Sequence, residues 1–417
     1  MRDIRKIASS EEMAAFIEIA ANAYPGFKIH TGEQKQSMTA KYWANQQEQT
    51  DQAIYGIWED RELTGGSRHH VFAMNLHNET ITAGGIGLVA VALLHKKEKI
   101  AKDIVLDFLH QCHEKQIALA MLYPFNPEFY RKMGFGFGSS MYQYRIRTVK
   151  LPQGSKDHII CLEQEQMHLL QDCYHRQLLQ TNGMLQRNEQ EWRRLLGSQT
   201  LKVYGYLQNG RLEGYTMMEF QAVSGGSFLQ YDIVVKELVY EHAQAFQELL
   251  AFLHSQSDQA QHVIFHLQDE NFLFALDDPR FGSDLLVPVY HETGRQGTGL
   301  MYRVIDAAIL FEQLKDHNFA GSNLTVQFQI HDSFTKYHKE PFTVQFAQGY
   351  PAVKSSSDSY DVRMEVDVAS FSSLITGAAD FGSLYRYGKI RLSADRYRTV
   401  LEQLFHVPMK PQCLTMF

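Results

Sequence analysis

The chain has 417 residues, enough for roughly three domains of ordinary size with several buried cores. Its hydrophobic content of 44% and charged content of 21% are typical of a globular protein. A formal net charge of −7 argues against a protein that binds nucleic acid in bulk, although an acidic surface suits cationic substrates.

The first block, residues 1–150, has the pattern of helices packed on a mixed, largely antiparallel sheet. An amphipathic helix comes first, and alternating polar and apolar residues then predict an antiparallel meander. The expected elements are a helix at 11–22, strands at 53–58, 68–76 and 80–92 with turns at 64–66 and 77–79, a helix from residue 100, a strand at 117–123, a short helix at 127–133 and a last strand at 141–148.

Residues 84–101, GGIGLVAVALLHKKEKIA, are the most informative segment of this block. They predict a buried strand that ends in a basic turn and opens a helix. The helix is indicated by apolar residues on one face, namely Ile100, Ala101, Ile104, Val105, Phe108, Leu109 and Cys112. Because free N–H groups and the helix dipole favour anions there, a cationic turn at a helix start predicts a pyrophosphate site. We therefore expect a cofactor that carries a nucleotide.

The second block, residues 151–295, follows a linker at 151–155 and repeats the order of the first block without close sequence identity. The expected elements are helices at 164–179 and 189–196, a hairpin of 202–207 and 212–220, a strand at 227–235, a helix at 242–254 and a strand at 262–267. Asn209-Gly210 marks the hairpin turn. The junction at residues 234–241, VVKELVYE, is acidic where a phosphate would lie, so this block is expected to be a structural, degenerate repeat.

The third block, residues 296–417, alternates short strands and helices. Strands are expected at 325–330, 343–346 and 362–366, helices at 306–314 and 394–405, and a loop at 348–361. The chain ends in an apolar segment whose last residue is Phe417. Since such a terminus is unfavourable in water, we expect it to dock on the protein.

Localisation and metal binding are predicted from what the sequence does not contain. The four cysteines are scattered, with no spacing suited to zinc, and His69-His70 has no acidic or cysteine partner at ligand spacing, so no metal is expected. The N-terminus has no apolar signal region, and no window approaches the roughly 20 apolar residues of a membrane span. A cytoplasmic protein without membrane contact is predicted.

Three features together resemble a known family: the glycine-bearing strand at 84–91, the basic turn after it, and the segment FYRKMGF at 129–135. They resemble the core of the GNAT acetyltransferases. With the three-block order and the terminal Phe417, the whole chain resembles the Eis (enhanced intracellular survival) branch of that family. The resemblance implies an α+β fold in three domains: a catalytic GNAT domain at 1–150, a degenerate GNAT-like domain at 151–295, and a smaller sterol-carrier-protein-like domain at 296–417 whose C-terminus reaches the active site. It also implies a homo-oligomer, for which the resemblance suggests a hexamer.

The resemblance further implies acetyl-CoA as the co-substrate and assigns residues to it. Backbone groups of Val89, Ala90 and Val91 would bind the pantetheine arm and polarise the thioester carbonyl. Phe125 and Asn126 would flank the other side of the cofactor. The turn that would hold the pyrophosphate consists of Lys97, Glu98, Lys99, Ile100, Ala101 and Lys102.

Two catalytic residues follow from the same resemblance. Tyr130 would protonate the departing CoA thiolate, and the terminal carboxylate of Phe417 would take a proton from the attacking amine, directly or through water. The implied reaction is direct acetyl transfer to a primary amine, on a small molecule or a protein lysine, with no nucleic acid involved.

The turn departs from the family pattern. Leu93 replaces the usual proline, Lys96-Lys97 replaces two arginines, Glu98 replaces a basic residue, and Lys99 replaces a glycine. Lysine keeps the charge of arginine but loses its bidentate fork. At the tail, Met416 stands where well-known members have an acidic residue, which disfavours aminoglycosides as substrates. These departures leave open an alternative function: an acetyl-CoA-binding pseudoenzyme, or a lipid or acyl carrier.

Overall fold

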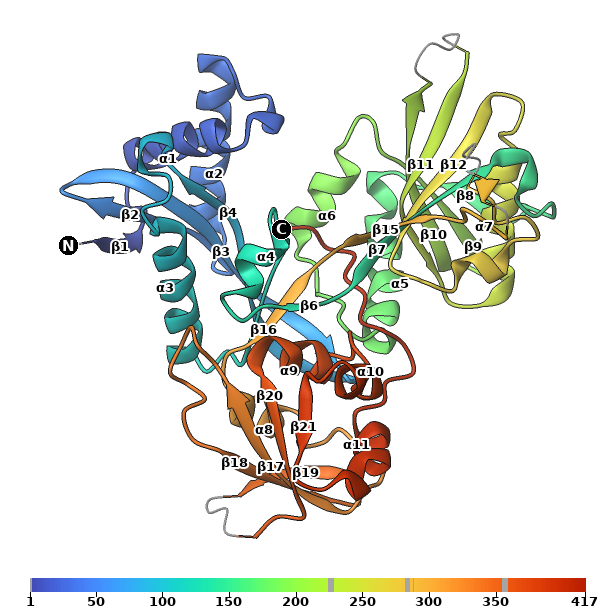
Figure 1. The fold of residues 1–417 in the computed structure, drawn as a ribbon. Helices are drawn as coiled ribbons and strands as arrows, with labels where there is room; N and C mark the ends of the chain where they lie inside the picture. Colours follow the sequence, from blue (N-terminus) through green and yellow to red (C-terminus); the bar gives the residue numbers. More distant parts are fainter. Residues whose placement is uncertain (1, 224–228, 282–285, 288, 355–358) are drawn as a thin grey trace. The chain divides into compact units, whose positions relative to one another are not determined.

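The computed structural model describes residues 2–223, 229–281, 286–287, 289–354 and 359–417 (Figure 1). The chain forms two compact units. Unit 1 consists of Met1–Gly138, Leu300–Pro411 and Met416–Phe417, and unit 2 consists of Ser139–Gly299 and Gln412–Thr415. Each unit is therefore built from segments that lie far apart in the sequence.

The first sheet of unit 1 has seven strands in the order β1-β2-β3-β4-β5-β16-β6. Strands β1 to β4 form an antiparallel meander, and β5 is parallel to β4. The strands are β1 (Asp3–Lys6), β2 (Gln52–Glu59), β3 (Glu62–Leu76), β4 (Glu79–Val91), β5 (Leu119–Leu122), β6 (Gly136–Phe137) and β16 (Met301–Val304). Strand β16 comes from the third block of the sequence, so that block completes the first sheet.

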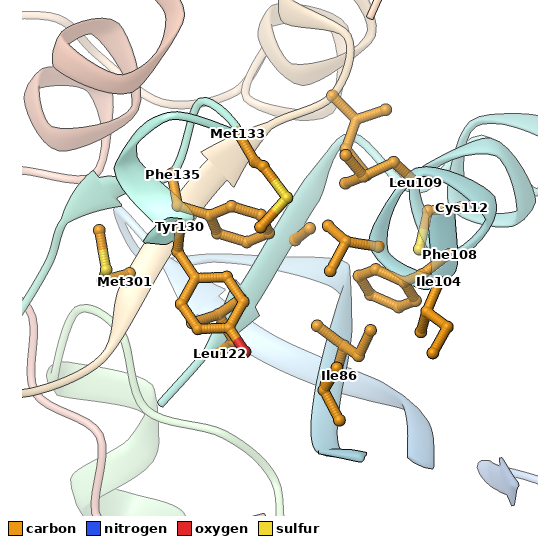
Figure 2. Close-up of a cluster of buried hydrophobic side chains, with 14 of the residues drawn as sticks. Ile86, Ile104, Phe108, Leu109, Cys112, Leu122, Tyr130, Met133, Phe135 and Met301 are labelled. Carbon is orange, nitrogen blue, oxygen red and sulfur yellow. The ribbon is translucent and has the colours of Figure 1, made fainter. Parts of the chain in front are cut away.

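Helices cover both faces of this sheet: α1 (Ser10–Ala23), α2 (Gly32–Glu48), α3 (Ile100–Glu114), α4 (Pro127–Arg131), and the short helices η1 (Pro25–Phe27) and η2 (Leu93–His95). Helix α1 packs with Ile54 of β2, whereas α3 packs with Ile57 of the same strand. Because residues three apart in a strand face opposite sides, α1 and α3 cover opposite faces. Figure 2 shows the α3 side, where Tyr130, Met133 and Phe135 come together with Phe108 and Ile86.

Strands β4 and β5 pair over only part of their length. Their parallel pairing ends at Gly85 opposite Met121, although β4 continues to Val91. Further along β4, the register with β3 shifts, so that Leu88 and Val89 together face Ser67 alone. Leu88 has a positive φ of 49°, the left-handed conformation that one type of β-bulge has at its first residue. The two strands thus separate beside a bulge, and backbone groups of β4 are left for another partner.

The second sheet of unit 1 has the order β19-β18-β17-β20-β21. Its strands are β17 (Leu324–His331), β18 (Phe342–Ala347), β19 (Tyr350–Lys354), β20 (Val362–Asp367) and β21 (Ile390–Leu392), and its helices are α8 (Ala307–Gln313), α9 (Val368–Ile375), α10 (Phe381–Arg386), η6 (Asp395–Tyr397) and α11 (Arg398–Leu404). Phe311, Phe328 and Phe371 lie at the centre, with ring centroids 5.3 to 6.3 Å apart. Phenylalanine rings thus fill the core between this sheet and its helices.

Unit 2 contains a seven-stranded sheet in the order β15-β7-β12-β11-β10-β9-β8. Its strands are β7 (Ser140–Arg147), β8 (Ile159–Cys161), β9 (Lys202–Gln208), β10 (Arg211–Ala222), β11 (Tyr231–Tyr240), β12 (Ala260–Leu267) and β15 (Arg295–Thr298), beside a pair β13 (Leu286–Val287) and β14 (Tyr290–His291). Its helices are η3 (Thr148–Lys150), η4 (Gln164–Gln166), α5 (Met167–Gln180), α6 (Glu189–Leu196), α7 (Ala243–His254) and η5 (Phe272–Ala275).

The predicted fold class, α+β with mixed sheets, is confirmed, and most predicted elements lie within a few residues of their expected bounds. Helix α2 was not predicted, because its face carries few apolar residues. Residues 64–66, expected as a turn, lie inside β3; the hairpin turns at Asp60-Arg61, both with positive φ. The loop expected at 348–361 contains β19. Residues 355–358 of that loop, and residues 227–228 of the strand expected at 227–235, lie outside the described residues.

Two strands pair with strands from a different sequence block than their own. The strand expected at 141–148 as the last of the first block is β7, and it pairs with β12 and β15 of unit 2. Strand β16, from the start of the third block, pairs with β5 and β6 of unit 1. Sequence periodicity predicts a strand but not its partner, because pairing is a long-range property. The division at residues 150 and 295 stays a prediction.

Candidate active site

The start of α3 carries the predicted basic turn. The residue before the helix, Lys99, has a φ of 66° and no side chain that caps the helix. Lys97 also has a positive φ, 70°. Left-handed backbone costs a lysine about 1 kcal/mol, which explains why glycine is the usual choice at such a turn. The first N–H groups of α3 are thus free of side-chain caps and suited to an anion.

The charges of this turn are arranged favourably for a diphosphate. Lys97, Lys99 and Lys102 are exposed. Glu98, the acidic departure, accepts from His95 Nδ1 at 3.0 Å, so part of its charge is engaged locally. Ile100 is buried and Ala101 partly buried, and they anchor the helix in the core. An uncapped helix start with three exposed lysines fits the phosphate end of acetyl-CoA.

Val89, Ala90 and Val91 lie where β4 has separated from β5. Their side chains are buried, which fixes the backbone at the bulge. The hydroxyl of Tyr24 donates to the carbonyl oxygen of Val89 at 2.7 Å. Tyr24 was not predicted as part of the site. It immediately follows α1, in a YPGF sequence that is typical of a turn, but nothing in that pattern indicates the bond to β4.

Tyr130 lies on α4 with 2% of its surface exposed. Its ring meets Phe125, Phe129 and Phe135 edge to face, with centroids 5.1 to 6.0 Å apart. Figure 2 shows its hydroxyl at the end of the ring away from Met133 and Phe135. Burial, and after it the nearby phenol of Tyr24, raise the pKa of Tyr130 well above its ordinary value. The hydroxyl therefore keeps its proton at neutral pH, as a proton donor must.

Phe125 and Asn126 lie between β5 and α4. The Asn126 side chain caps α4 by accepting from the Phe129 N–H at 3.2 Å. Phe125 is 64% exposed, although its ring contacts that of Tyr130. An exposed aromatic residue beside the separated strands can contact a bound cofactor, whereas the position of Asn126 is explained by capping alone.

Phe417 docks in unit 1, as expected for the apolar tail. Its ring lies among His70, Phe72 and Tyr123, with centroids 5.0 to 5.5 Å away. Burial, followed by the charge of Arg68, lowers the pKa of His70 well below its ordinary value, so this imidazole is neutral. Aromatic contacts thus hold the last side chain and fix where the terminal carboxylate lies.

Two glycines of β4 make room for Phe417. A Cβ atom on Gly85 would lie 2.9 Å from the Phe417 ring, and one on Gly87 would lie 3.2 Å from its main-chain oxygen. Because residues 85 and 87 face the same side of a strand, they form one smooth seat. The alternate glycines were noted in the sequence only as part of a buried strand; their role in admitting the C-terminus depends on the fold.

Residues from the third block hold α4 in place. Asp367, which caps α9, accepts from Arg131 at 2.7 Å. Arg303 of β16 is fully buried and donates to the carbonyl oxygen of Met133 at 2.5 Å and to Asp332 at 2.6 Å. Gly134 lies directly under Arg303, where any Cβ would collide with the guanidinium. The glycine of the FYRKMGF segment thus admits Arg303, which lies on a strand from the third block of the sequence.

Metal binding has one geometric candidate among the described residues. Ligand atoms of Glu59, His95 and Glu98 lie within 4.8 Å of one another. Glu59 accepts from Arg2 at 3.4 Å and Glu98 pairs with His95, so internal partners account for this group. Elsewhere, His69 bonds Ser67 at 2.9 Å beside a cavity of about 470 Å³. That no metal is bound stays a prediction.

The structure therefore brings most predicted site residues to one segment of unit 1. Residues 85–102 contain the bulge of β4 and the basic turn before α3. Tyr130 belongs to the buried cluster that includes Ile86 and Val89, and Phe417 lies against Gly85 and Gly87. Within the described part of the chain, no helix is both long and apolar enough to span a bilayer.

Family models match three segments of the chain. Residues 3–138 and 183–304 each match an acetyltransferase (GNAT) domain, and residues 312–414 match a sterol carrier protein domain. No curated protein sequence is significantly similar. Fold and matches together define an acetyltransferase with two GNAT domains and a C-terminal sterol-carrier-like domain.

Solved structures share this fold over 100% of both chains. A GCN5-related N-acetyltransferase from Anabaena variabilis ATCC 29413 has a TM-score of 0.82 at 16% identity. A probable N-acyltransferase from Enterococcus faecalis V583 has a TM-score of 0.78 at 20% identity. Eis1 from Mycobacterium abscessus has a TM-score of 0.77 at 17% identity. The chain belongs to the GNAT acetyltransferase family, with the domain order of its Eis-like members.

Proposed function

We propose that the protein transfers an acetyl group from acetyl-CoA directly to a primary amine. The observation that carries this proposal is the seat of Phe417 on β4: the terminal carboxylate lies at Gly87, beside the bulge at Leu88 and Val89. A carboxylate beside separated strands, an uncapped helix start and a protonated phenol are the groups that acetyl transfer to an amine needs.

Acetyl-CoA would bind along the separated strands, where it supplies an activated thioester. Backbone groups of Val89, Ala90 and Val91 bind the pantetheine arm, and the turn at residues 97–102 holds the diphosphate. Phe125 covers the other side, and Asn126 keeps α4 in position. The Tyr24 hydroxyl holds the carbonyl of Val89, which stabilises the bulge against slipping back into register.

Proton transfer is assigned to two groups. The Phe417 carboxylate takes the proton that the amine loses as its nitrogen bonds to the acetyl carbon. The Tyr130 hydroxyl gives a proton to the sulfur as the C–S bond breaks. Burial keeps the Tyr130 hydroxyl protonated until the thiolate forms, which suits it to this role.

The acceptor is proposed to be a small-molecule amine or a protein lysine. Met416 precedes the carboxylate and is 74% exposed. An apolar side chain there offers no charge to a polycation, so we propose that aminoglycosides are not the preferred acceptors. A homo-oligomer, a cytoplasmic location, and domains at 1–150, 151–295 and 296–417 complete the proposal.

A carrier function is less well supported. A sterol or acyl chain needs an internal cavity, whereas phenylalanine rings fill the interior of the second sheet of unit 1. The altered turn at Glu98 and Lys99 is the one feature that favours a pseudoenzyme.

Thermal unfolding with and without acetyl-CoA tests the proposal. A ligand at 100 times its Kd stabilises a protein by about 2.7 kcal/mol, so Tm should rise by several degrees. CoA release is then measured with a panel of primary amines. No shift at millimolar acetyl-CoA would favour a carrier, and a shift without CoA release for any amine would favour a pseudoenzyme.

A further inference from the structure

Unit 2 contains the same separation of parallel strands as unit 1. Strands β11 and β12 pair as far as Val235 opposite Phe265, and β11 then continues to Tyr240 beside β10 alone. The register of β11 with β10 shifts at this point, so that Lys236 is an extra residue and Glu237 follows it. Strand β11 therefore stops pairing with β12 at a bulge, and we call the site between this bulge and the end of β12 the unit 2 groove.

The C-terminal segment of the chain lies in the unit 2 groove. Gln268, which directly follows β12, donates to the carbonyl oxygen of Cys413 at 3.0 Å and accepts a short hydrogen bond from the Cys413 N–H. One carboxamide thus satisfies both backbone groups of a single residue. Such a contact recognises a peptide backbone irrespective of the side chain it carries.

A buried ion pair holds the next two residues. Arg187 is 7% exposed and binds Glu237 through two hydrogen bonds of 3.0 and 2.7 Å. The same guanidinium donates to the carbonyl oxygen of Leu414 at 2.7 Å and to the Thr415 hydroxyl at 3.2 Å. Tyr174 also bonds the Thr415 hydroxyl, at 3.1 Å.

These bonds show that the groove is built around a peptide. Without residues 413–415, buried donors of Arg187 and both polar atoms of Gln268 would lose partners, and leaving buried polar groups unpaired is unfavourable. The start of α7 is unsuited to a diphosphate, because its capping residue His242 bonds Glu213 and the adjacent Glu241 is acidic.

We propose that the unit 2 groove is a peptide-binding site whose ligand is the chain's own C-terminal segment, and that it binds and releases this segment without unfolding of unit 2. The groove binds an extended peptide with a hydroxyl-bearing residue two positions after the residue held by Gln268. Each chain consequently binds acetyl-CoA at one site only. The inference does not depend on the catalytic roles proposed above.

Cys413 provides the test, because its thiol is buried and donates to the Thr415 carbonyl oxygen at 3.3 Å. Alkylation of Cys413 by a maleimide, followed by mass spectrometry of the C-terminal peptide, reports release of the segment. Cys161→Ser removes the exposed thiol. Cys173, buried in the core of unit 2, reports opening of the whole unit in the same sample.

In the Gln268→Ala variant, the maleimide should label Cys413 about tenfold faster or more than in the parent chain, while the rate of labelling at Cys173 stays the same. Gln177→Ala is the matched control, since the Gln177 side chain, among the residues that the structure describes, bonds only Thr181 and its loss should change neither rate. Thr415→Val, which alters the segment and leaves the groove intact, should act like Gln268→Ala. A synthetic peptide of residues 412–417 with serine for Cys413 should compete for the groove and accelerate labelling to a plateau; a scrambled peptide should not.

Three results would overturn the proposal. The first is labelling of Cys413 that is no faster in Gln268→Ala and Thr415→Val than in the parent chain. The second is labelling that rises equally at Cys173, which would mean that the segment leaves only when unit 2 unfolds. The third is a calorimetric stoichiometry of two acetyl-CoA molecules per chain. Failure of acetyl transfer would leave all three readouts unaffected and thus bear on the proposed function alone.

Discussion

The main-chain oxygen of Phe417 lies against Gly87 of β4, at 3.2 Å from the position that a Cβ atom on residue 87 would take. The last residue of the chain therefore touches the strand that bears the bulge. If the carboxylate is the base, its position depends on a glycine 330 residues away, since a side chain at residue 87 would occupy the same space.

Gly87→Ala tests this relationship directly. Gly87 has no positive φ, so alanine fits its backbone, but the new methyl group would push the carboxylate away by a few tenths of an ångström. We expect kcat to fall about tenfold with little change in Tm, because position affects rate steeply. Gly32→Ala, at a site with no atom within 4 Å, is the control. An unchanged kcat at saturating substrates would contradict a catalytic seat at Gly87.

One glycine added after Phe417 converts its carboxylate into an amide. We expect a loss of about 10²-fold or more in kcat, as for removal of a positioned base, while acetyl-CoA still raises Tm. Met416→Leu keeps the carboxylate and serves as the control. Steady-state CoA release measures both variants. Full activity in the extended chain would show that another group accepts the proton.

Tyr130→Phe removes one oxygen from a ring held by aromatic packing. The hydroxyl makes no hydrogen bond with the described part of the chain, so stability should change little. We expect kcat to fall about 10²-fold while the Kd of acetyl-CoA stays nearly constant, because the bond to the leaving thiolate forms mainly in the transition state. Tyr385→Phe, at a half-buried tyrosine of α10 whose hydroxyl bonds Asp395, is the control. A weaker Kd with normal kcat would assign Tyr130 to binding instead.

Glu98→Gln removes the negative charge from the basic turn at the start of α3. We expect the Kd of acetyl-CoA to fall by a few-fold at low salt, and the difference to shrink as salt rises and screens exposed charges. Glu340→Gln, on another exposed glutamate of unit 1, is the control. Calorimetric titration at two ionic strengths measures the effect. An equal or weaker affinity would mean that Glu98 points away from the diphosphate.

Buried histidines predict how stability depends on pH. Burial, and then the charge of Lys115, lower the pKa of His69 to about 3, while burial lowers that of His77 to about 4. Below pH of about 6.5 the unfolded chain gains protons that the folded chain refuses, so stability falls as pH falls, by up to ~1.4 kcal/mol per pH unit for each histidine.

Tm measured from pH 7.5 to 5 checks this sign. His69→Gln should lower Tm at all pH values, because it loses stacking on Tyr55, but its Tm should fall less steeply with decreasing pH. His168→Gln, at a histidine whose side chain is not buried, should keep the slope of the parent chain. A parent Tm that rises on acidification would refute the neutral state of these histidines.

Local signals in the sequence predicted the parts of the fold that neighbouring residues decide. Asn209-Gly210 marks a hairpin because both residues tolerate positive φ, and both adopt it. The apolar face of α3 was predicted from its spacing, and the basic turn before it from composition. The FYRKMGF segment and the terminal Phe417 suggested the family.

Tertiary structure alone decided which strands pair and what lies against β4. Periodicity could not show that β7 joins the sheet of unit 2 or that β16 joins the first sheet of unit 1, since a strand presents the same backbone to any neighbour. Nor could it show that Gly134 admits Arg303, or that Gly85 and Gly87 admit Phe417. The sequence by itself determined most of the elements and the residue types of the site, because these depend on short-range propensity. The three-dimensional fold decided their partners, because close packing between distant segments is set only when the whole chain has folded.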